Sequence, residues 1–540
     1  MKLLELLEGI DPISVDVLGA MPQTQSAKRH NTDEHDANMM NMEIASIHYR
    51  AQEVLPGGMF VALKGQTADG HDFMHQAFQN GAGAVVAQKE PPQPYLFESR
   101  TPTAQMPPVF VRVPDTRIAM ADLAARFYGD PSADMTLIGI TGTNGKTTVA
   151  YLIESILLQA GYKTGVIGTI NCRYADKIFT NPMTTPESLD LQRILAQMRR
   201  EGVTHVVMEA SSHAMALGRI RHCWLDVAVF TNLSQDHLDF HGDMQAYWNS
   251  KKSLFTEYLT QGPKKETATA VINCDDSHGV ELADHLTVPV IRTGSTFDGD
   301  VKAGDIQCNL IGTAGKVATP GGSFDFKTPL VGVHNVENIL TAAGVGTALK
   351  IAPPAIKAGI EALAAIPGRL ESITNNTGRF VYVDYAHTPD ALENAVAAIK
   401  EIAPARIICV FGCGGDRDQK KRPLMGEIAA RLCDLAIVTS DNPRSEDPLA
   451  IIEQILPGVR QAQGVAYSST DIKTGFGAKG FVVEPDRRRA IELGIRASRP
   501  DDAVLIAGKG HEPYQILADK TIDFDDREEA RKVLNMLSSI

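Results

Sequence analysis

The chain has 540 residues and is predicted to form several domains, and its composition excludes several classes of protein. A single hydrophobic core rarely grows beyond about 250–300 residues, so we expect three or four domains. Apolar residues make up 44% of the chain and charged residues 22%, which is typical of globular proteins and excludes collagen, coiled coil and wholesale disorder. The 65 acidic and 52 basic residues give a formal charge of −13, which is unfavourable for coating nucleic acid or an anionic membrane.

The cysteines and the first residues point to a protein of a reducing compartment. The seven cysteines include no C-x-x-C pair, so we predict neither a disulfide framework nor a zinc ribbon. The opening MKLLELLEGIDPISV is too acidic for a secretory leader, and no run approaches the 18 apolar residues of a membrane-spanning helix. We therefore expect a cytoplasmic protein without membrane insertion.

The first part of the chain predicts a small α/β unit that ends near Ser132. Residues 59–63 form a buried apolar run typical of a strand, and residues 76–87 predict a short helix, a glycine turn and a strand. Residues 22–42 are polar and aperiodic, and residues 89–108 are rich in proline, so both are expected to be loops.

Two longer α/β regions follow. In the first, short apolar strands are expected at 135–140, 165–170, 205–210, 227–233 and 269–273. In the second, which begins after Gly368, they are expected at 380–385, 406–412, 435–441 and 503–508. Helical stretches separate these strands, which predicts βαβ units and parallel, doubly wound sheets. The alternating segment 294–330 predicts short antiparallel strands.

The strongest local motif is Gly142-Thr-Asn-Gly-Lys-Thr-Thr148, which follows a strand and begins a helix. In that position backbone N–H groups bind phosphate oxygens, Lys146 reaches the outer phosphates, and the Thr147 hydroxyl binds Mg²⁺. The common P-loop spacing requires glycine at position 140, which is Ile140, so this loop is a shortened relative. The alternative is a glycine-rich turn with an incidental lysine.

A carboxylate and two histidines follow the next predicted strands. Glu209 ends the run HVVME, where a Mg²⁺ ligand belongs, although a capping acid is the alternative. His237 and His241 have the i, i+4 spacing of a zinc site, but Leu238 stands where the H-E-x-x-H motif requires glutamate, so zinc hydrolysis is disfavoured. From its local sequence alone, Lys251 is interpreted as a solvated lysine.

Three polar loops follow strands of the last region, at residues 411–418, 441–444 and 507–512. The carboxyl ends of parallel strands meet at one edge of a sheet, so these loops are expected to lie together. Their arginines suit a carboxylate and their acids suit an ammonium, which favours a zwitterionic ligand. Cys413 lies in the first loop without a neighbouring histidine and is interpreted as a packed thiol rather than a nucleophile.

The motifs GTNGKTT, EASSHA, TNLSQDHLDFHG, PGRLE, DYAHTPDAL, FGCGGDRDQKKRPLMG, DNPR and AGKGHE, in this order, resemble those of the Mur ligases. The resemblance covers the chain from about residue 60 to its end. It implies three α/β domains: a small UDP-sugar-binding domain at 1–133, a central P-loop ATPase domain with a parallel sheet at 134–368, and a Rossmann-like amino-acid-binding domain at 369–540. It also implies a monomeric, cytoplasmic, ATP-dependent amide-forming ligase of peptidoglycan precursor synthesis.

The resemblance further implies the substrates. DNPR indicates meso-2,6-diaminopimelate, because Arg444 can pair with the distal carboxylate that lysine lacks. This amino acid would be joined to UDP-N-acetylmuramoyl-L-alanyl-D-glutamate through an acyl phosphate formed from ATP, with Mg²⁺ as cofactor.

Individual residue roles are likewise implied by the resemblance. Catalysis is assigned to Lys146, Glu209, His237 and Lys251. Mg²⁺ binding is assigned to Thr147, Glu209, His237 and a carbamate formed on Lys251. ATP binding is assigned to Gly142, Thr143, Asn144, Gly145, Lys146, Thr147, Thr148, Asn335, Arg369 and Asp384. Binding of the UDP-linked substrate is assigned to Thr184, Thr185, Ser211 and Arg219. Binding of the amino acid is assigned to Arg417, Asp441, Asn442, Pro443, Arg444, Gly508 and Glu512.

The chain departs from the family pattern at three places. His48-Tyr49-Arg50 stands in place of D-S-R, Met183 in place of asparagine, and Leu217 in place of a glutamine that contacts substrate in some members. These differences leave the uridine contacts open. The alternatives in function are a ligase of the same superfamily that adds another amino acid, or that adds glutamates to a folate, a P-loop hydrolase or switch, and an inactive binding protein.

Overall fold

The structure is a computed structural model that describes residues 1–17, 41–65, 68–90, 108–181, 183–402, 404–462, 464–472 and 475–538. The loops predicted at 22–42 and 89–108 lie almost wholly outside these residues. The chain divides into two compact units, one of Met1–Thr143, Tyr162–Ala270 and Asp284–Val290, the other of Asn144–Gly161, Val271–Ala283 and Ile291–Ile540. None of the helices in the described parts combines the length and apolar character of a membrane span.

The first unit begins with a five-stranded sheet in the order β1-β5-β4-β3-β2, in which β1 is antiparallel to β5 and the other pairs are parallel. Its elements are α1 (Leu3–Leu7), β1 (Ser14–Val17), β2 (Ile47–His48), η1 (Ala51–Glu53), β3 (Met59–Val61), η2 (Gly70–Phe73), α3 (Met74–Gln79), β4 (Ala84–Ala87), β5 (Val109–Arg112), α4 (Thr116–Tyr128) and η3 (Pro131–Asp134). The strand predicted at 59–63 and the helix, turn and strand predicted at 76–87 are confirmed. Buried apolar clusters on both faces of the sheet form its core.

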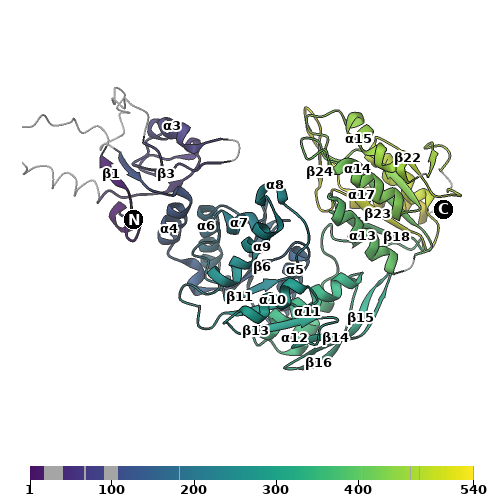
Figure 1. The fold of residues 1–540 in the computed structure, drawn as a ribbon, viewed down its shortest axis with the longest axis horizontal. Coiled ribbons are helices and arrows are strands. Elements are labelled where there is room, and N and C mark those ends of the chain that lie inside the picture. The colour runs from purple at the N-terminus through teal and green to yellow at the C-terminus, as the bar shows by residue number, and fades with distance from the viewer. Residues whose placement is uncertain are drawn as a thin grey trace, which may run out of the picture. The chain divides into compact units, whose positions relative to one another are not determined.

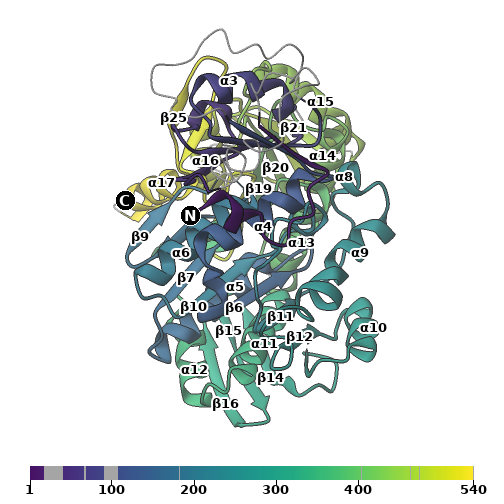
Figure 2. The same ribbon diagram turned by 90° about the vertical axis from the view of Figure 1, so that its left-hand side faces the viewer.

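The first unit continues with parallel strands in the order β11-β6-β10-β7, followed by the antiparallel strands β8 and β9 (Figure 2). The elements are β6 (Thr136–Thr141), β7 (Thr164–Ile167), β8 (Cys172–Tyr174), β9 (Lys177–Phe179), α6 (Ser188–Arg200), β10 (His205–Glu209), α7 (Ser212–Ala216), β11 (Val227–Phe230), α8 (Leu238–His241), α9 (Met244–Ser253) and the π-helix η4 (Leu254–Tyr258). β6, β10 and β11 are almost entirely buried, as expected for parallel strands covered on both faces. Their carboxyl ends lead into the phosphate loop, Glu209 and Thr231.

The second unit opens with α5 (Lys146–Gln159), which packs against α11 and α12. The further elements of this part are β12 (Thr269–Asn273) and β13 (Val290–Gly294) at the boundary between the units, α10 (Ser277–His285), β14 (Val301–Asn309), β15 (Gly312–Thr319), β16 (Gly322–Thr328), α11 (Val333–Ala348) and α12 (Pro353–Ala362). β14, β15 and β16 form an antiparallel meander, so the prediction for 294–330 is confirmed. A Cβ on Gly359 would lie 2.4 Å from the Cα of Ile156, which shows how closely α12 approaches α5.

The rest of the second unit is a doubly wound domain with strand order β17-β18-β23-β19-β20-β22-β21, parallel except for β17. Its elements are β17 (Glu371–Ser372), β18 (Phe380–Asp384), α13 (Pro389–Glu401), β19 (Ile407–Phe411), α14 (Lys421–Leu432), β20 (Leu435–Val438), α15 (Pro448–Gln461), β21 (Val465–Tyr467), β22 (Gly480–Val483), α16 (Arg487–Ala497), β23 (Ala503–Ala507), β24 (Tyr514–Ile516), β25 (Thr521–Asp523) and α17 (Asp526–Ser538). Helices α13, α14 and α15 cover one face and α16 and α17 the other. Figure 1 labels α13, α14, α15 and α17 of this domain. All four predicted strands of this region are confirmed.

Candidate functional site

The glycines of the phosphate loop have positive φ angles and close neighbours. Gly142 has φ +146°, and a Cβ there would lie 1.9 Å from Thr231 Oγ1. Gly145 has φ +84°, and a Cβ there would lie 2.4 Å from Asn338 Oδ1. Asn338 in turn donates to Asn335 Oδ1 at 3.0 Å. Both glycines are therefore required by geometry.

Replacing Gly145 by alanine is expected to impair ATP use, whereas replacing Gly161 is not. Gly161 is a matched control, because its φ is +83° and a Cβ there would meet nothing within 4 Å. Both variants should lose about 1–2 kcal/mol of stability from the left-handed backbone. Only Gly145→Ala should also displace the loop and raise the KM for ATP, by about tenfold to a hundredfold. Steady-state kinetics measure the difference, and equal KM values in the two variants would contradict it.

Lys251 is buried beneath the phosphate loop. Its side chain on α9 is 2% exposed, and Nζ donates to the Gly142 carbonyl at 2.7 Å. The ammonium also lies over the Tyr247 ring, 4.3 Å from its centroid, and the Tyr247 hydroxyl is 3.2 Å from Thr143 Oγ1. The interpretation of Lys251 as a solvated lysine is therefore wrong, because α9 turns this residue away from solvent and toward the loop.

Glu209 is a buried carboxylate held in a fixed orientation. It is 1% exposed at the end of β10, and its two oxygens accept hydrogen bonds from Thr169 N at 3.0 Å and Thr169 Oγ1 at 2.9 Å. A Cβ on Gly168 would lie 2.5 Å from Glu209 Oε1, so the chain before Thr169 can approach this closely only as glycine. Carboxylate and hydroxyl oxygens are the hard ligands that Mg²⁺ prefers, so the chemistry of Glu209 and Thr147 fits this ion.

The residues predicted to bind the UDP-linked substrate form one network next to Glu209. Thr185 Oγ1 donates to the Glu209 carbonyl at 2.8 Å and accepts from Ser211 N at 3.1 Å. Thr184 Oγ1 lies 3.1 Å from Thr169 Oγ1. Arg219 Nη1 donates to the Thr185 carbonyl at 3.2 Å. The structure thus brings all four predicted residues together around the carboxyl end of β10.

Arg219 shares a buried acid with an arginine of α4. Glu187, which is 8% exposed, forms an ion pair with Arg219 Nη2 at 2.9 Å and accepts a hydrogen bond from Arg117 Nη1 at 3.0 Å. The Arg219 Nε atom is buried without a hydrogen-bond partner among the described residues. Local sequence reasoning did not select Glu187, because its partners lie 32 and 70 residues away.

His237 is the N-cap residue of α8 and belongs to a group of aromatic rings. Its φ is +53°, its Nε2 lies 3.4 Å from Asp236, and its ring centroid is 4.8 Å from that of His213. Burial together with the nearby His237 and His241 lowers the pKa of His213 to about 4, so His213 is neutral at pH 7. Within the described ranges no group of three or more His, Cys, Asp or Glu side chains is arranged to hold a metal.

Arg369 and Asp384 lie at the start of the doubly wound domain. Arg369 Nη2 lies 3.5 Å from Thr147 Oγ1, and its guanidinium lies over the Tyr385 ring, 5.2 Å from the centroid. Asp384 accepts from Leu370 N at 2.7 Å and from Ala386 N at 2.8 Å. Burial raises the pKa of Asp384, and the nearby Arg369 opposes this effect. The side chains predicted to bind ATP in this unit therefore include two, Thr147 and Arg369, that lie against each other.

The three polar loops of the doubly wound domain follow β19, β20 and β23, which are adjacent strands. Asn442 Nδ2 donates to Glu512 at 2.8 Å, which joins the second and third loops. A Cβ on Gly508 would lie 2.5 Å from Asp441 Oδ2, an atom that is buried without a hydrogen-bond partner in the described part of the chain. The predicted cluster of acids and arginines is therefore present at one edge of the sheet.

The first and second loops are also joined. Gly415 N donates to the Asn442 carbonyl at 2.9 Å, and a Cβ on Gly415 would lie 1.9 Å from the Pro443 carbonyl oxygen. Arg444 has φ +52° and donates from Nη1 to the Gly415 carbonyl at 2.8 Å. Arg417 is exposed, and its Nη1 donates to the Asp416 carbonyl at 3.0 Å. Two guanidinium groups thus extend from neighbouring loops.

Two buried cations contact these loops and were not among the predicted site residues. Lys509 is fully buried and donates to Asn442 Oδ1 at 3.2 Å and Glu512 Oε2 at 3.3 Å. Arg487 is buried against Asp526 at 2.6 Å and donates to the Ala507 carbonyl at 3.0 Å. Lys509 could have been selected because it lies inside the motif AGKGHE, whereas no local sequence motif indicates a role for Arg487.

Cys413 is a packed thiol. It is 3% exposed, its Sγ lies 3.6 Å from Met425 Sδ, and burial raises its pKa to about 12. A thiol with this pKa is protonated at neutral pH and is a poor nucleophile. All seven cysteines are free, as the spacing predicted.

Comparisons with known sequences define the class. The chain matches the profiles described as Mur ligase family, catalytic domain (residues 43–128), Mur ligase middle domain (140–346) and Mur ligase, glutamate ligase domain (368–510). The chain therefore belongs to the Mur ligase family, and its three-domain α/β architecture is that of the family.

Two curated relatives carry one name. The UDP-N-acetylmuramoyl-L-alanyl-D-glutamate–2,6-diaminopimelate ligase of Geobacter metallireducens is 47% identical over 498 residues, covering 92% of this chain and 95% of the relative. That of Geobacillus thermodenitrificans is 43% identical over 491 residues, covering 91% and 95%. A solved structure of a ligase with this name has a TM-score of 0.64 at 29% identity and covers 100% of this chain and 99% of its own.

Proposed function

We propose that this chain is an ATP-dependent ligase that adds meso-2,6-diaminopimelate to UDP-N-acetylmuramoyl-L-alanyl-D-glutamate in cytoplasmic peptidoglycan precursor synthesis. The observation that carries the proposal is the cluster of Arg417, Asp441, Asn442, Arg444 and Glu512 at one edge of the doubly wound sheet. This cluster offers guanidinium groups for carboxylates and acids for an ammonium, as a zwitterion with a second carboxylate requires. The relatives of 43–47% identity carry the name of this reaction.

The reaction needs an activated carboxylate, because a free carboxylate does not acylate amines at neutral pH. The γ-carboxylate of the D-glutamyl residue attacks the γ-phosphorus of ATP, and the bond to the bridging oxygen breaks to release ADP. The amine of diaminopimelate then attacks the acyl carbon, and the tetrahedral intermediate collapses as phosphate leaves and a proton is lost. The protein contributes mainly by positioning the reactants and neutralising their charge.

The phosphate loop supplies the nucleotide contacts in this proposal. Lys146 and the backbone N–H groups of residues 142–148 bind the phosphates, at the start of α5 where the helix dipole favours anions. Asn335, Arg369 and Asp384 complete the nucleotide contacts. The position of Arg369 against Thr147 supports this assignment, because it brings a positive charge to the beginning of the same helix.

Mg²⁺ is proposed to be held by the Thr147 hydroxyl, the Glu209 carboxylate, His237 and a carbamate on Lys251. When bound, the ion would neutralise charge on the transferred phosphoryl group. The burial of Glu209 and Lys251 next to the phosphate-loop strand supports their part in this set. Thr169 fixes the Glu209 carboxylate, and Gly142 accepts from the Lys251 ammonium before any modification.

Thr184, Thr185, Ser211 and Arg219 are proposed to bind the UDP-linked dipeptide substrate. Their network surrounds the carboxyl end of β10, so a substrate bound there would reach the same strand end as Glu209. The ion pair with Glu187 orients Arg219. It also compensates the buried positive charge of this arginine.

The test is an amino-acid-dependent phosphate-release assay with ATP, Mg²⁺ and the UDP-linked dipeptide. Phosphate release is expected with meso-diaminopimelate, little with lysine, and none when either amino acid or dipeptide is omitted. The LL and DD isomers of diaminopimelate, run in parallel, measure stereochemical selectivity. Phosphate release that needs no amino acid would favour a P-loop hydrolase, and turnover with lysine equal to that with diaminopimelate would refute the substrate assignment.

A further inference from the structure

Arg422, on the first turn of α14, is a completely buried arginine with four hydrogen bonds. Its Nη1 donates to Glu446 Oε2 and Gln454 Oε1, both at 2.8 Å, and its Nη2 donates to Glu446 Oε1 at 2.8 Å and to the Gly414 carbonyl at 3.1 Å. Two parallel bonds to one carboxylate fix both partners in orientation. Burying a guanidinium costs desolvation free energy, which these four hydrogen bonds must offset. This differs from a surface ion pair, which has no such cost.

Glu446 connects this arginine to both loops that carry the predicted amino-acid contacts. It lies two residues after Arg444, and its Oε1 also accepts from Asp416 N at 2.6 Å. The Asp416 carboxylate in turn accepts from Ser445 N at 3.2 Å and Ser445 Oγ at 2.6 Å. The hydrogen bonds of Arg422 hold the pKa of Glu446 at about 2, so Glu446 is ionised at neutral pH. The two loops are thus tied together at residues adjacent to Arg417 and Arg444.

The orientation of Arg444 depends on this tie. Its guanidinium donates to the Gly415 carbonyl at 2.8 Å, and Gly415 follows Gly414, whose carbonyl Arg422 binds. Arg444 also has the left-handed φ of +52°, which a non-glycine residue keeps only where its surroundings enforce it. A shift of Gly414–Gly415 away from Arg422 would therefore move the guanidinium of Arg444.

We infer that Arg422 and Glu446 are positioning residues for amino-acid selection: they lock the two loops in the register that aims Arg444 and Arg417 at the distal carboxylate of the amino acid. This inference rests on the proposed function, since it assigns a role within the same site. Neither residue needs to touch a substrate, because their effect is transmitted through Gly414, Gly415 and Asp416.

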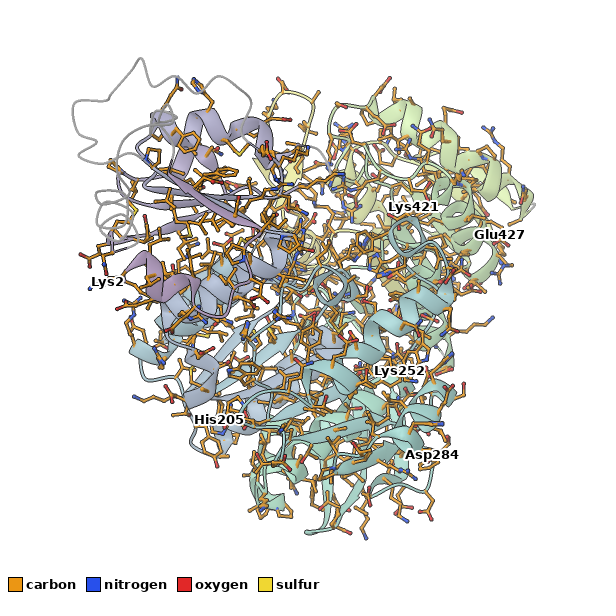
Figure 3. All side chains as sticks on the ribbon, turned by 60° about the vertical axis from the view of Figure 1, so that its left-hand side comes forward. Lys2, His205, Lys252, Asp284, Lys421 and Glu427 are labelled. Carbon is orange, nitrogen blue, oxygen red and sulfur yellow. The ribbon has the colours of Figure 1, made fainter. Side chains whose placement is uncertain are left out.

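The test compares Arg422→Lys and Glu446→Gln with a control on the same helix. Lysine keeps the charge but cannot form two parallel bonds, and glutamine keeps the shape but loses the charge. Each variant is expected to raise the KM for meso-diaminopimelate about tenfold or more, with the KM values for ATP and the UDP-linked dipeptide within about twofold of wild type. The control is Glu427→Gln, which breaks the exposed bond from Arg431 to Glu427 on α14 and should leave all KM values unchanged; Figure 3 labels Glu427 and Lys421 on this helix.

The two residues should also act as one unit. In the double variant the rise in KM for diaminopimelate should be much smaller than the product of the single effects. A merely structural role would lower the thermal midpoint and the amount of active enzyme, with KM values unchanged or shifted equally for all three substrates, and that result would overturn the inference. Glu446→Gln lies in a loop outside the helices, so it remains informative if Arg422→Lys does not fold. Absence of diaminopimelate-dependent phosphate release in wild type would refute the proposed function, whereas normal wild-type turnover with unshifted variants refutes only the inference.

Discussion

Lys251→Ala is expected to lower ligase turnover by about 10³-fold, the loss typical of removing one electrostatic group from a reaction centre. The lysine is buried beneath the phosphate loop, with its Nζ on the Gly142 carbonyl, and in the proposed function it carries a carbamate. The shortened side chain leaves space in which a small acid can supply the missing carboxylate. Added formate or acetate should therefore restore part of the turnover, as measured by phosphate release.

Two further variants separate the carbamate from other roles of this lysine. Lys251→Arg keeps a cation that can reach the Gly142 carbonyl but cannot be carbamoylated, so it should be as inactive as the alanine variant. Lys252→Ala changes the neighbouring, partly exposed residue of α9, labelled in Figure 3, and should retain wild-type rates. Wild-type turnover in Lys251→Arg would refute the carbamate, and an increase in the turnover of Lys252→Ala on adding formate would show that the acid acts elsewhere.

Arg444→Met is expected to abolish discrimination between diaminopimelate and lysine. Losing a charge-assisted pair with the distal carboxylate costs about 2–5 kcal/mol, so kcat/KM for meso-diaminopimelate should fall about 10²-fold or more. Lysine presents an ammonium at that end, and removing the guanidinium relieves a repulsion, so kcat/KM for lysine should stay level or rise. The measurement is the ratio of the two kcat/KM values in one assay.

The control for Arg444→Met is Arg431→Met, which removes an exposed guanidinium from α14. It should leave the ratio unchanged, because surface ion pairs contribute little and lie away from the polar loops. If Arg444→Met lowered kcat/KM for both amino acids by the same factor, the arginine would serve folding or general binding, and the specificity argument would fail.

The sequence alone predicted most of the longer strands, whose signal is local. The buried parallel strands β6, β10, β19, β20 and β23 are continuous apolar runs, and each precedes a polar loop, so both the strands and the loops could be located. The short exposed strand β21 and the hairpin of β24 and β25 carry no such run and were not predicted. Several predicted strands end earlier than expected, for example β20 at Val438 and β11 at Phe230, because the polar residues that follow them adopt loop geometry.

What could not be predicted depends on distant partners. Lys251 has the local sequence of any polar helical residue, and the carbonyl to which it donates lies 109 residues away. Glu446 gains its role from Arg422, 24 residues earlier, and Glu187 gains its role from Arg117, 70 residues earlier. The partners of these charged residues come together only in the folded chain, so local sequence patterns cannot predict the pairs.

In the doubly wound domain, the residues that form the hydrophobic core are separate from the residues proposed to select the amino acid. Its two apolar clusters, one on each face of the sheet, contain none of the residues Arg417, Asp441, Asn442, Arg444 and Glu512. These residues stand on short loops at a single edge. New ligand preferences can therefore evolve, or be engineered, by exchanging a few loop residues on an unchanged scaffold. The Arg422–Glu446 pair that joins the loops would have to be exchanged together with the binding side chains that it orients.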